Sequence, residues 1–476
     1  MSTEFRSNVA HALKRDAVQT HLKTVVDRLR AHRQGALGND AAFERLRNRC
    51  EAIRADAIRR LPDLLQQFES KAQRNGIQVH WAETTLQANQ IVLDIMQRHR
   101  ATFLVKGKSM VSEEMGVNAF LQSHGIDCLE TDLGEFIVQL AGEKPAHIIV
   151  PAIHKNRREV AHLIHRHFPG LPYSEDIETL AQSVRHFMRD KFRSAPVGLT
   201  GVNFMVAETG TLCLVENEGN GRMCSTLPPV HIAVTGIEKV IARLEDLPPL
   251  LNLLTRSATG QPVTAYVNMI NSPRRPGDKD GPDEVHLILL DNGRSRIAGD
   301  PELLETLHCI RCGACINHCP VYRQIGGHAY GTVIPGPIGT ILEPQKQGLD
   351  AAAGELPQAS TLCGACAEVC PVRIPIPAII NRLRWESVRK NQQSQNCRPV
   401  VPGAGSGRKP LEAGIWKIWA WCCTHPRMYN RMTKLATRLR NRLPADMGAW
   451  TAVRKALKPA QATLHERLRM MDIDHE

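Results

Sequence analysis

Two runs of closely spaced cysteines constrain this chain more than any other feature of its 476 residues. The first run lies at 309–320 and follows the pattern C-x2-C-x2-C-x3-C-P. In this spacing three thiolates ligate one [4Fe–4S] cluster, and the fourth, which precedes proline, usually ligates a second cluster. The run therefore predicts a domain that binds iron–sulfur clusters, with the spacing of a bacterial ferredoxin.

The second run, at 363–371, repeats the pattern without its first cysteine, and Ser360 stands in the missing place. When two such runs exchange their last cysteines, each cluster takes its ligands from both runs. The second cluster then has three cysteines, and the motif does not supply its fourth ligand. This exchange assigns Cys309, Cys312, Cys315 and Cys370 to the first cluster and Cys319, Cys363 and Cys366 to the second.

Disulfide bonding and zinc binding are less favoured roles for these cysteines. Disulfide frameworks belong to small exported chains, and residues 1–16 are polar and charged, without the apolar segment of a signal peptide. Structural zinc sites use paired C-x2-C motifs or histidines rather than a run that ends in Cys-Pro. The other seven of the 14 cysteines are scattered along the chain, which is typical of a reducing compartment. We therefore expect a cytoplasmic protein.

Residues 76–298 alternate between short apolar segments and helical segments, which predicts an α/β domain with a mostly parallel, doubly wound sheet. Later in this region we expect a pair of strands with a turn at 208–210, and a strand that ends in a hairpin-type turn at 291–293. The expected strands lie at 77–81, 102–106, 126–130, 147–151, 202–216 (as a pair), 230–234 and 285–290, and the expected helices at 84–99, 112–123 and 155–167.

Ligands of such a sheet bind at the carboxyl ends of its strands. Lys106, Lys108, Ser109 and His154 follow expected strands, so they are candidate ligand-binding residues. The Gly-Lys-Ser at 107–109 does not form a nucleotide-binding P-loop, because that pattern requires glycine at position 102, which is threonine. The region also lacks the Gly-x-Gly-x-x-Gly fingerprint of a dinucleotide site.

Residues 1–75 are predicted to be helical. Apolar residues recur at helical spacing, as at Cys50 and Ala57, and we expect arginines such as Arg47 and Arg54 to decorate the other faces of the helix. The packing of this helix on the following domain is favoured over a nucleic-acid-binding arm.

Positive charge is concentrated behind the second cysteine run. Residues 371–476 have 20 Lys and Arg against 7 Asp and Glu, whereas the rest of the chain has 40 against 41. Trp416, Trp419 and Trp421 precede a basic helix at 427–442. Packing or partner binding is the favoured role of this tail, and peripheral contact with a membrane is the alternative. Nucleic-acid binding is not expected, because the tryptophans do not interleave with arginines along a groove, and no apolar stretch of the chain is long enough to span a membrane.

These patterns predict five segments along the chain. They are an N-terminal helical segment (1–75), the α/β domain (76–298), the dicluster domain (299–390), a linker (391–410) and a basic, Trp-containing helical C-terminal extension (411–476).

The order of these motifs resembles the iron–sulfur B subunit of the bacterial lactate-utilisation system. The α/β region, with Lys-Gly-Lys-Ser at 106–109 and Glu-Thr-Gly-Thr at 208–211, is similar to the lactate-utilisation (LUD) domain. The segment from CIRCGAC at 309–315 to LCGAC at 362–366 is similar to its α-helical dicluster ferredoxin domain, and the Trp-rich tail resembles its C-terminal extension.

The resemblance implies a fold of the sugar-isomerase and CoA-transferase group for the α/β domain. It also implies a cytoplasmic complex of three proteins that oxidises L-lactate to pyruvate, in which this chain carries electrons through two [4Fe–4S] clusters. A role for Glu208 like that of the nucleophilic glutamate in CoA transferases is not expected. The alternative is a self-contained 2-hydroxy acid oxidoreductase, with its substrate bound by the α/β domain near Lys106, Lys108 and His154.

Overall fold

The computed structural model describes residues 3–37, 41–168, 170, 172–388, 401–403, 410–442, 444 and 458–470. The chain divides into two compact units. The first comprises residues 1–387 and 393–404, and the second comprises residues 388–392 and 405–476. The first unit therefore contains both the α/β region and the two cysteine runs. Most of the predicted linker, 391–410, lies outside the described residues.

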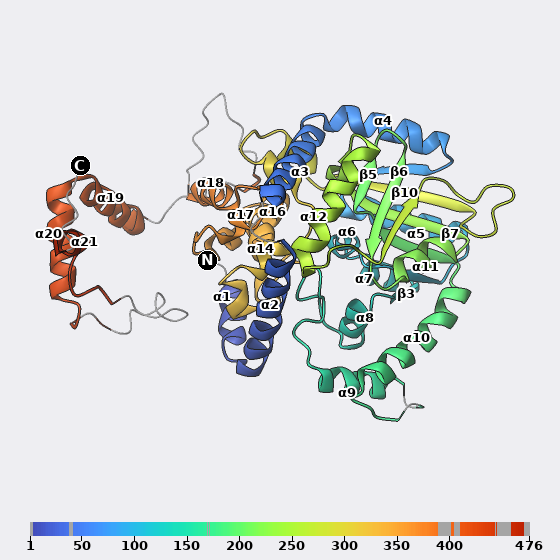
Figure 1. The fold of residues 1–476 in the computed structure, drawn as a ribbon, viewed down its shortest axis with the longest axis horizontal. Coiled ribbons are helices and arrows are strands. Elements are labelled where there is room, and N and C mark those ends of the chain that lie inside the picture. The colour runs from blue at the N-terminus through green and yellow to red at the C-terminus, as the bar shows by residue number, and fades with distance from the viewer. Residues whose placement is uncertain are drawn as a thin grey trace. The chain divides into compact units, whose positions relative to one another are not determined.

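Six parallel strands form the central sheet of the first unit, in the order β1-β10-β7-β4-β2-β3 (Figure 1). The inner strands are buried along almost their whole length, as expected for parallel strands that are covered on both faces. The predicted parallel α/β sheet is thereby confirmed. Its strands are β1 (Gln78–Ala82), β2 (Phe103–Lys106), β3 (Asp127–Glu130), β4 (Val197–Gly201), β7 (Val230–Gly236) and β10 (Glu284–Leu290).

A smaller sheet of four strands has the order β8-β5-β6-β9. The expected strand pair is present, because β5 runs antiparallel to β6 with Phe204 opposite Cys213. Met205 and Leu212 of this sheet share a hydrophobic core with Leu287 of the central sheet. The strands of the smaller sheet are β5 (Phe204–Val206), β6 (Thr211–Glu216), β8 (Val240–Ile241) and β9 (Tyr266–Ile270).

Helices follow the strands of the α/β region. The first begins at a capping box, in which Thr84 accepts from the Gln87 amide and the Gln87 side chain reaches back to the cap. The helix expected at 112–123 is divided at Gly116, whose left-handed backbone (φ +63°) ends one helix before the next begins. These helices are α5 (Thr85–Arg98), α6 (Met110–Met115), α7 (Val117–Gln122), α8 (Leu133–Leu140), α9 (Arg157–His167), α10 (Ile177–Ser194), α11 (Asn220–Thr226), α12 (Leu247–Thr259) and α13 (Arg294–Ala298).

Two local predictions for the α/β region are wrong. Residues 147–151 form no strand, because Ile148 is buried by the hydrophobic core around the cysteine runs rather than by a sheet, and the amides of Ile149 and Val150 donate to His147 Nδ1. The turn at 291–293 makes no hairpin, since β10 pairs in parallel with both of its neighbours and the turn leads into α13.

The cysteine runs lie in a region of short helices, against which α2 and α3 of the N-terminal segment pack (Figure 1). Helix α4 packs instead on β1 and β8 of the α/β region. The described residues from 3 to 74 are therefore mainly helical, and they contact both parts of the first unit. The N-terminal helices are α1 (Thr3–Ala12), α2 (Asp16–Leu37), α3 (Ala41–Arg59) and α4 (Leu61–Arg74), and the helices of the cysteine region are α14 (Ala314–Asn317), α15 (Tyr322–Ile325), α16 (Gly336–Gln347), α17 (Ala365–Glu368) and α18 (Ile376–Val388).

The described part of the second unit is helical, as predicted for the C-terminal extension. Its helices are α19 (Pro410–Thr424), α20 (Pro426–Arg438) and α21 (Leu464–Met470). Trp416, Trp419 and Trp421 are each about half exposed on α19. Among the described helices of the whole chain, none has the length and apolarity needed to cross a membrane.

Candidate functional site

The two cysteine loops have the same local backbone. In the first loop Arg311 (φ +61°) and Gly313 (φ +75°) are left-handed, and in the second loop Leu362 (φ +56°) and Gly364 (φ +86°) are left-handed at the equivalent places. Left-handed backbone is uncommon for residues other than glycine, so its recurrence at Arg311 and Leu362 is a specific likeness. The second loop therefore repeats the first in structure as well as in sequence.

Backbone amides point at the sulfur atoms of these loops. Arg311 N lies 3.4 Å from Cys309 Sγ, and Ile374 N lies 3.4 Å from Cys370 Sγ. The equivalent contact in the second loop is made to oxygen, since Leu362 N donates to Ser360 Oγ at 3.1 Å. Ser360 thus occupies the structural place of Cys309. Hydrogen bonds to sulfur are one of the features by which a protein tunes an iron–sulfur cluster.

The four cysteines assigned to the first cluster line one small cavity, together with apolar side chains such as Ile148 and Ile338. Burial raises the pKa of the Cys370 thiol to about 11 and that of Cys315 well above its ordinary value. Thiols in such surroundings remain protonated unless a metal displaces the proton. A convergent set of buried and partly buried thiols in an apolar cavity fits an iron–sulfur group and does not fit a hydrophilic cation.

The three cysteines assigned to the second cluster are also neighbours. Burial, and then the proximity of Cys319, raises the pKa of Cys366 to about 12, and Cys363 contributes to the raised pKa of both other thiols. Cys319 and Cys366 are buried, whereas Cys363 is exposed. The second group thus differs from the first in having a side open to solvent.

Arginines from the N-terminal helices hold the backbone of the cysteine loops. Arg47 donates to the carbonyl oxygens of Cys370 and Glu368, each at 2.8 Å from Nη2. Arg54 is 1% exposed and binds four carbonyl groups, among them those of Leu307 (3.0 Å) and His308 (3.3 Å). The expectation that these two arginines decorate the other faces of the helix is therefore wrong. The carbonyl groups of the folded loops supply partners that allow a guanidinium to be buried.

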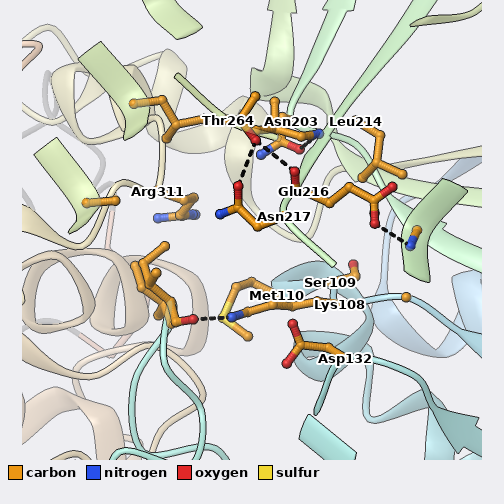
Figure 2. Close-up of a pocket in the computed structure, with 18 of the residues that line it drawn as sticks. Lys108, Ser109, Met110, Asp132, Asn203, Leu214, Glu216, Asn217, Thr264 and Arg311 are labelled. Carbon is orange, nitrogen blue, oxygen red and sulfur yellow. Dashed lines mark hydrogen bonds between the residues drawn. The ribbon is translucent and has the colours of Figure 1, made fainter. Parts of the chain in front are cut away.

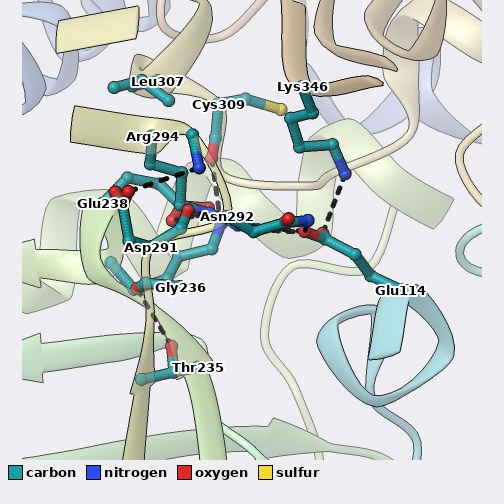
Figure 3. A network of polar contacts seen from close by, with 12 residues as sticks. Glu114, Thr235, Gly236, Glu238, Asp291, Asn292, Arg294, Leu307, Cys309 and Lys346 are labelled. Atoms are coloured by element: carbon teal, nitrogen blue, oxygen red, sulfur yellow. Dashed lines mark hydrogen bonds and ion pairs between the residues drawn. The ribbon is translucent and has the colours of Figure 1, made fainter. Parts of the chain in front are cut away.

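A buried network of ion pairs joins the α/β sheet to the first cysteine loop (Figure 3). Arg294 contacts Glu238 at 2.7 Å and Glu114 at 2.9 Å, and Lys346 also contacts Glu114 at 2.9 Å. Lys239 donates to the Cys309 carbonyl at 3.0 Å. Although burial acts to raise the pKa of Glu238, Arg294 and the other nearby cations lower it to about 2. The carboxylates are therefore charged, and the network fixes the loop that begins at Cys309.

A pocket of about 290 Å³ lies between the carboxyl ends of the central strands and this cysteine loop (Figure 2). Its α/β side includes Lys108 and Ser109 after β2, and its opposite side includes Ile310 and Arg311, which separate Cys309 from Cys312. A ligand in the pocket would thus contact both the α/β region and the loop of the first cysteine run.

The candidate ligand-binding residues of the sequence divide into two pairs. Lys108 and Ser109 line the pocket, as expected. Lys106 does not, because its fully buried ammonium is enclosed by Glu113 at 2.9 Å and Glu130 at 2.6 Å. His154 does not either, because its Nε2 lies 2.6 Å from Glu143 in another part of the unit. Carboxylates therefore engage both residues, and neither lines this pocket.

Other residues of the pocket were not predicted from the sequence. Arg311 lies inside a cysteine motif, Lys239 follows β7, and Asn217 and Thr264 lie at the ends of β6 and β9. Only the polar, Gly-rich stretch at 217–222 gave a sequence signal for this side of the pocket. Glu208 is distant from these residues; it accepts from the Leu244 amide at 2.9 Å and is not part of the pocket lining.

Three family models match successive parts of the chain. The LUD domain matches residues 65–290, the 4Fe-4S dicluster domain matches residues 305–374, and the C-terminal domain of lactate utilisation protein B matches residues 382–472. Lactate utilization protein B of Macrococcus caseolyticus is 40% identical over 97% of this chain and 93% of its own length. The chain belongs to the lactate utilisation protein B family.

Two further relatives are similar over most of their length. Lactate utilization protein B of Bacillus subtilis is 39% identical over 97% of this chain and 95% of its own length. A protein of Escherichia coli named as an uncharacterized electron transport protein, YkgF, is 40% identical over 89% of this chain and 88% of its own length. All seven cysteines of the two runs fall within the dicluster match, so this member of the lactate utilisation protein B family is an iron–sulfur protein.

Proposed function

We propose that this chain is the iron–sulfur electron-transfer subunit of a complex that oxidises L-lactate to pyruvate. The observation that carries the proposal is that seven cysteines form two adjacent groups, in the same compact unit as an α/β domain of the lactate-utilisation (LUD) family. The relatives' names support the same pathway, and one of them is named for electron transport. The complex would be cytoplasmic, since the thiols of the described cysteines are free.

The residues of the two loops have distinct roles in this proposal. Cys309, Cys312, Cys315 and Cys370 would hold one [4Fe–4S] cluster, and Cys319, Cys363 and Cys366 would hold a second. Each cluster, when bound, supplies a carrier for one electron at a time. The buried arginines keep the loop backbones in place through carbonyl groups, while the exposed position of Cys363 gives the second group contact with the solvent side, where a partner can dock.

Metal content is the first test. Anaerobically purified protein is expected to contain about eight iron atoms with equivalent sulfide, as two four-iron clusters require. The Cys312→Ala variant should lose one cluster, whereas Cys213→Ala, which removes a buried thiol outside the loops, should keep both. Tightly bound zinc in place of iron and sulfide would contradict the proposal.

Lactate oxidation by defined subsets of proteins tests the subunit role. Oxidation removes two electrons and two protons from the substrate, and this chain is proposed to accept electrons rather than to complete the reaction alone. Pyruvate formation with an artificial acceptor is expected only when the other subunits of the lactate-utilisation complex are present. The second candidate function, a self-contained 2-hydroxy acid oxidoreductase, is favoured by the pocket beside the cysteine loop. It would be established if the cluster-loaded chain formed pyruvate by itself.

A further inference from the structure

The pocket between the α/β sheet and the first cysteine loop has a feature that the electron-transfer role does not use. Its wall on the cysteine side is formed by Ile310 and Arg311, the residues between Cys309 and Cys312. We propose that this pocket binds a small carboxylate, with Arg311 and Lys108 as its cationic recognition groups. That the carboxylate is a 2-hydroxy or 2-oxo acid rests on the proposed function.

Arg311 presents its guanidinium to the pocket (Figure 2). Its Nη2 lies 3.7 Å from Glu238, which is a loose ion pair, because Glu238 also binds Arg294 at 2.7 Å. Its Nη1 is buried and has no hydrogen-bond partner among the described residues. A buried donor without a partner destabilises the protein, and a carboxylate is the group that a guanidinium fork binds best. A carboxylate ligand would therefore satisfy a donor that the protein leaves open.

Lys108 adds positive charge to the same pocket, and Lys239 adds hydrogen-bond donors. Lys108 donates to the Ile149 carbonyl, and Lys239 donates to the Cys309 carbonyl at 3.0 Å, so each ammonium retains donors for a further partner. Both residues line the pocket. Arg311 and Lys108 thus place two cations around one cavity, and Lys239, whose pKa burial lowers to about 7, adds a basic group at the cysteine loop.

The carboxylates of the pocket are largely engaged by the protein. Glu216 accepts from the amides of Gly221 (2.6 Å) and Arg222 (2.7 Å) and from the Asn268 side chain (2.9 Å). Asp132 accepts from the Glu135 amide at 3.1 Å and caps α8. These hydrogen bonds hold the two carboxylates against donors of the protein. A ligand anion beside Arg311 and Lys108 therefore meets less repulsion from them.

A hydroxyl or keto oxygen of the ligand also has candidate partners. Ser109 Oγ accepts from the Ser112 amide at 3.1 Å, which leaves its own proton available to donate. Glu218 accepts from the Leu133 amide at 3.0 Å, and burial, with the help of Asp132, raises its pKa to about 6. The pocket volume of about 290 Å³ is at the lower end of the range of small-molecule sites. These features suit a small oxygen-rich acid.

The experiment is a calorimetric titration of the full-length, cluster-loaded chain under anaerobic conditions with L-lactate and with pyruvate, and with acetate and inorganic phosphate as competitors. At least one of the two acids is expected to bind. The Arg311→Gln variant should bind it roughly tenfold or more weakly, since a charge-assisted pair is lost. Lys108→Gln should also weaken binding of the acid. Lys108 lies on the α/β side of the pocket, away from the cysteines.

Arg373→Gln is the matched control. Arg373 also has a left-handed backbone (φ +52°) and lies three residues after the assigned Cys370, but its guanidinium pairs with Glu44 rather than lining the pocket. Its binding of the acid should equal that of the unchanged protein. The carboxylate assignment is overturned if neither acid binds, if phosphate alone binds, or if Arg311→Gln and Lys108→Gln bind as tightly as the control.

The iron content and partner-dependent lactate oxidation of the same preparations separate this inference from the proposed function. Protein that contains its clusters and supports lactate oxidation with its partners, but binds no acid, leaves the electron-transfer role intact and excludes the ligand site. Protein that binds the acid through Arg311 but supports no lactate oxidation keeps the site and contradicts the function.

Discussion

Ser360 takes the place of a cysteine and keeps that position's hydrogen bond. Leu362 N donates to its Oγ at 3.1 Å, as Arg311 N does to Cys309 Sγ at 3.4 Å. A hydroxyl is a poor ligand for iron, because its proton is far harder to remove than that of a thiol, whose pKa is about 8.5. The proposed second cluster is therefore expected to have an open or labile iron.

Ser360→Cys should make the second cluster more robust, because the loop already holds this position as it holds Cys309. Electron paramagnetic resonance of the air-exposed protein should show a three-iron signal in the unchanged chain and none in the variant. Ser360→Ala is the control, and it should keep the signal. If the unchanged protein shows two equally stable four-iron clusters and Ser360→Ala alters neither, a ligand outside the motif completes the site. Cys422 and Cys423 of the second unit, and Cys397 outside the described residues, would then be tested.

The lowered pKa of Glu238 predicts that the protein loses stability in acid. Its pKa of about 2 in the folded protein lies below the ordinary value of 4.5, so its ionised form contributes stability above about pH 4.5 that is lost as the pH falls towards 2. Glu238→Gln removes one of the two carboxylates that neutralise the buried Arg294, so we expect roughly 3 kcal/mol less unfolding free energy at pH 7. Urea denaturation from pH 7 down to pH 3 should show a flatter pH dependence for this variant. Glu245→Gln, which changes an exposed pair with Arg243, should behave as the unchanged protein.

At the scale of elements, α3 shows what sequence patterns can and cannot predict. The spacing of residues such as Cys50 and Ala57 predicts the helix, and apolar runs predict five of the six parallel strands, all except β4 (Val197–Gly201). Arg47 and Arg54 were placed wrongly, because arginine counts as polar in such patterns. A signal was present, since the two arginines are seven residues apart and share a face with Cys50 and Ala57. The partners that permit their burial are loop carbonyls hundreds of residues away, which no local pattern contains.

The residues of the pocket were likewise predictable only in part. Lys108 and Ser109 could be predicted, because the carboxyl ends of parallel strands are ligand positions whatever the family. Arg311 could not, because its approach to the sheet depends on how the cysteine loop packs against the α/β domain. The run at 147–151 was mistaken for a strand for the same reason, as its apolar side chains are buried by that packing.

The α3 helix gives a prediction of its own. Arg54→Met removes the donor to carbonyl groups of Val240, Leu307 and His308, which lie on β8 and just before the first cysteine. We expect a loss of about 3–5 kcal/mol of unfolding free energy, since several buried acceptors lose a charged donor together. Arg49→Met, at an exposed position of the same helix, should cost little. Chemical denaturation of the cluster-loaded proteins measures both, and equal stability of the two variants would show that Arg54 does not hold the loop.

At the scale of the whole molecule, the second unit differs from the first in its surface. Its α19 presents three half-exposed tryptophans, and α20 has exposed basic residues. Residues 371–476 carry a balance of +13, whereas the rest of the chain is close to neutral. A segment of this composition can associate with an acidic partner protein or with anionic lipid, and in both cases the association would be electrostatic in part. We expect the partner subunit to be the occupant.

Removal of residues 411–476 should therefore abolish association with the partner subunits and leave the iron content unchanged, because all seven assigned cysteines precede the deletion. A milder change, in which Arg427, Arg431 and Arg438 become glutamine, should weaken the association and reduce its dependence on salt, since exposed charges are screened over about 8 Å at physiological ionic strength. The same number of charges removed from the exposed residues Arg185, Arg189 and Arg193 of α10 provides the control. Co-purification at rising salt measures the association. A complex that survives the deletion and ignores salt would assign the interface to the first unit, while binding of the intact chain to anionic vesicles but not to its partners would identify the extension as a membrane contact.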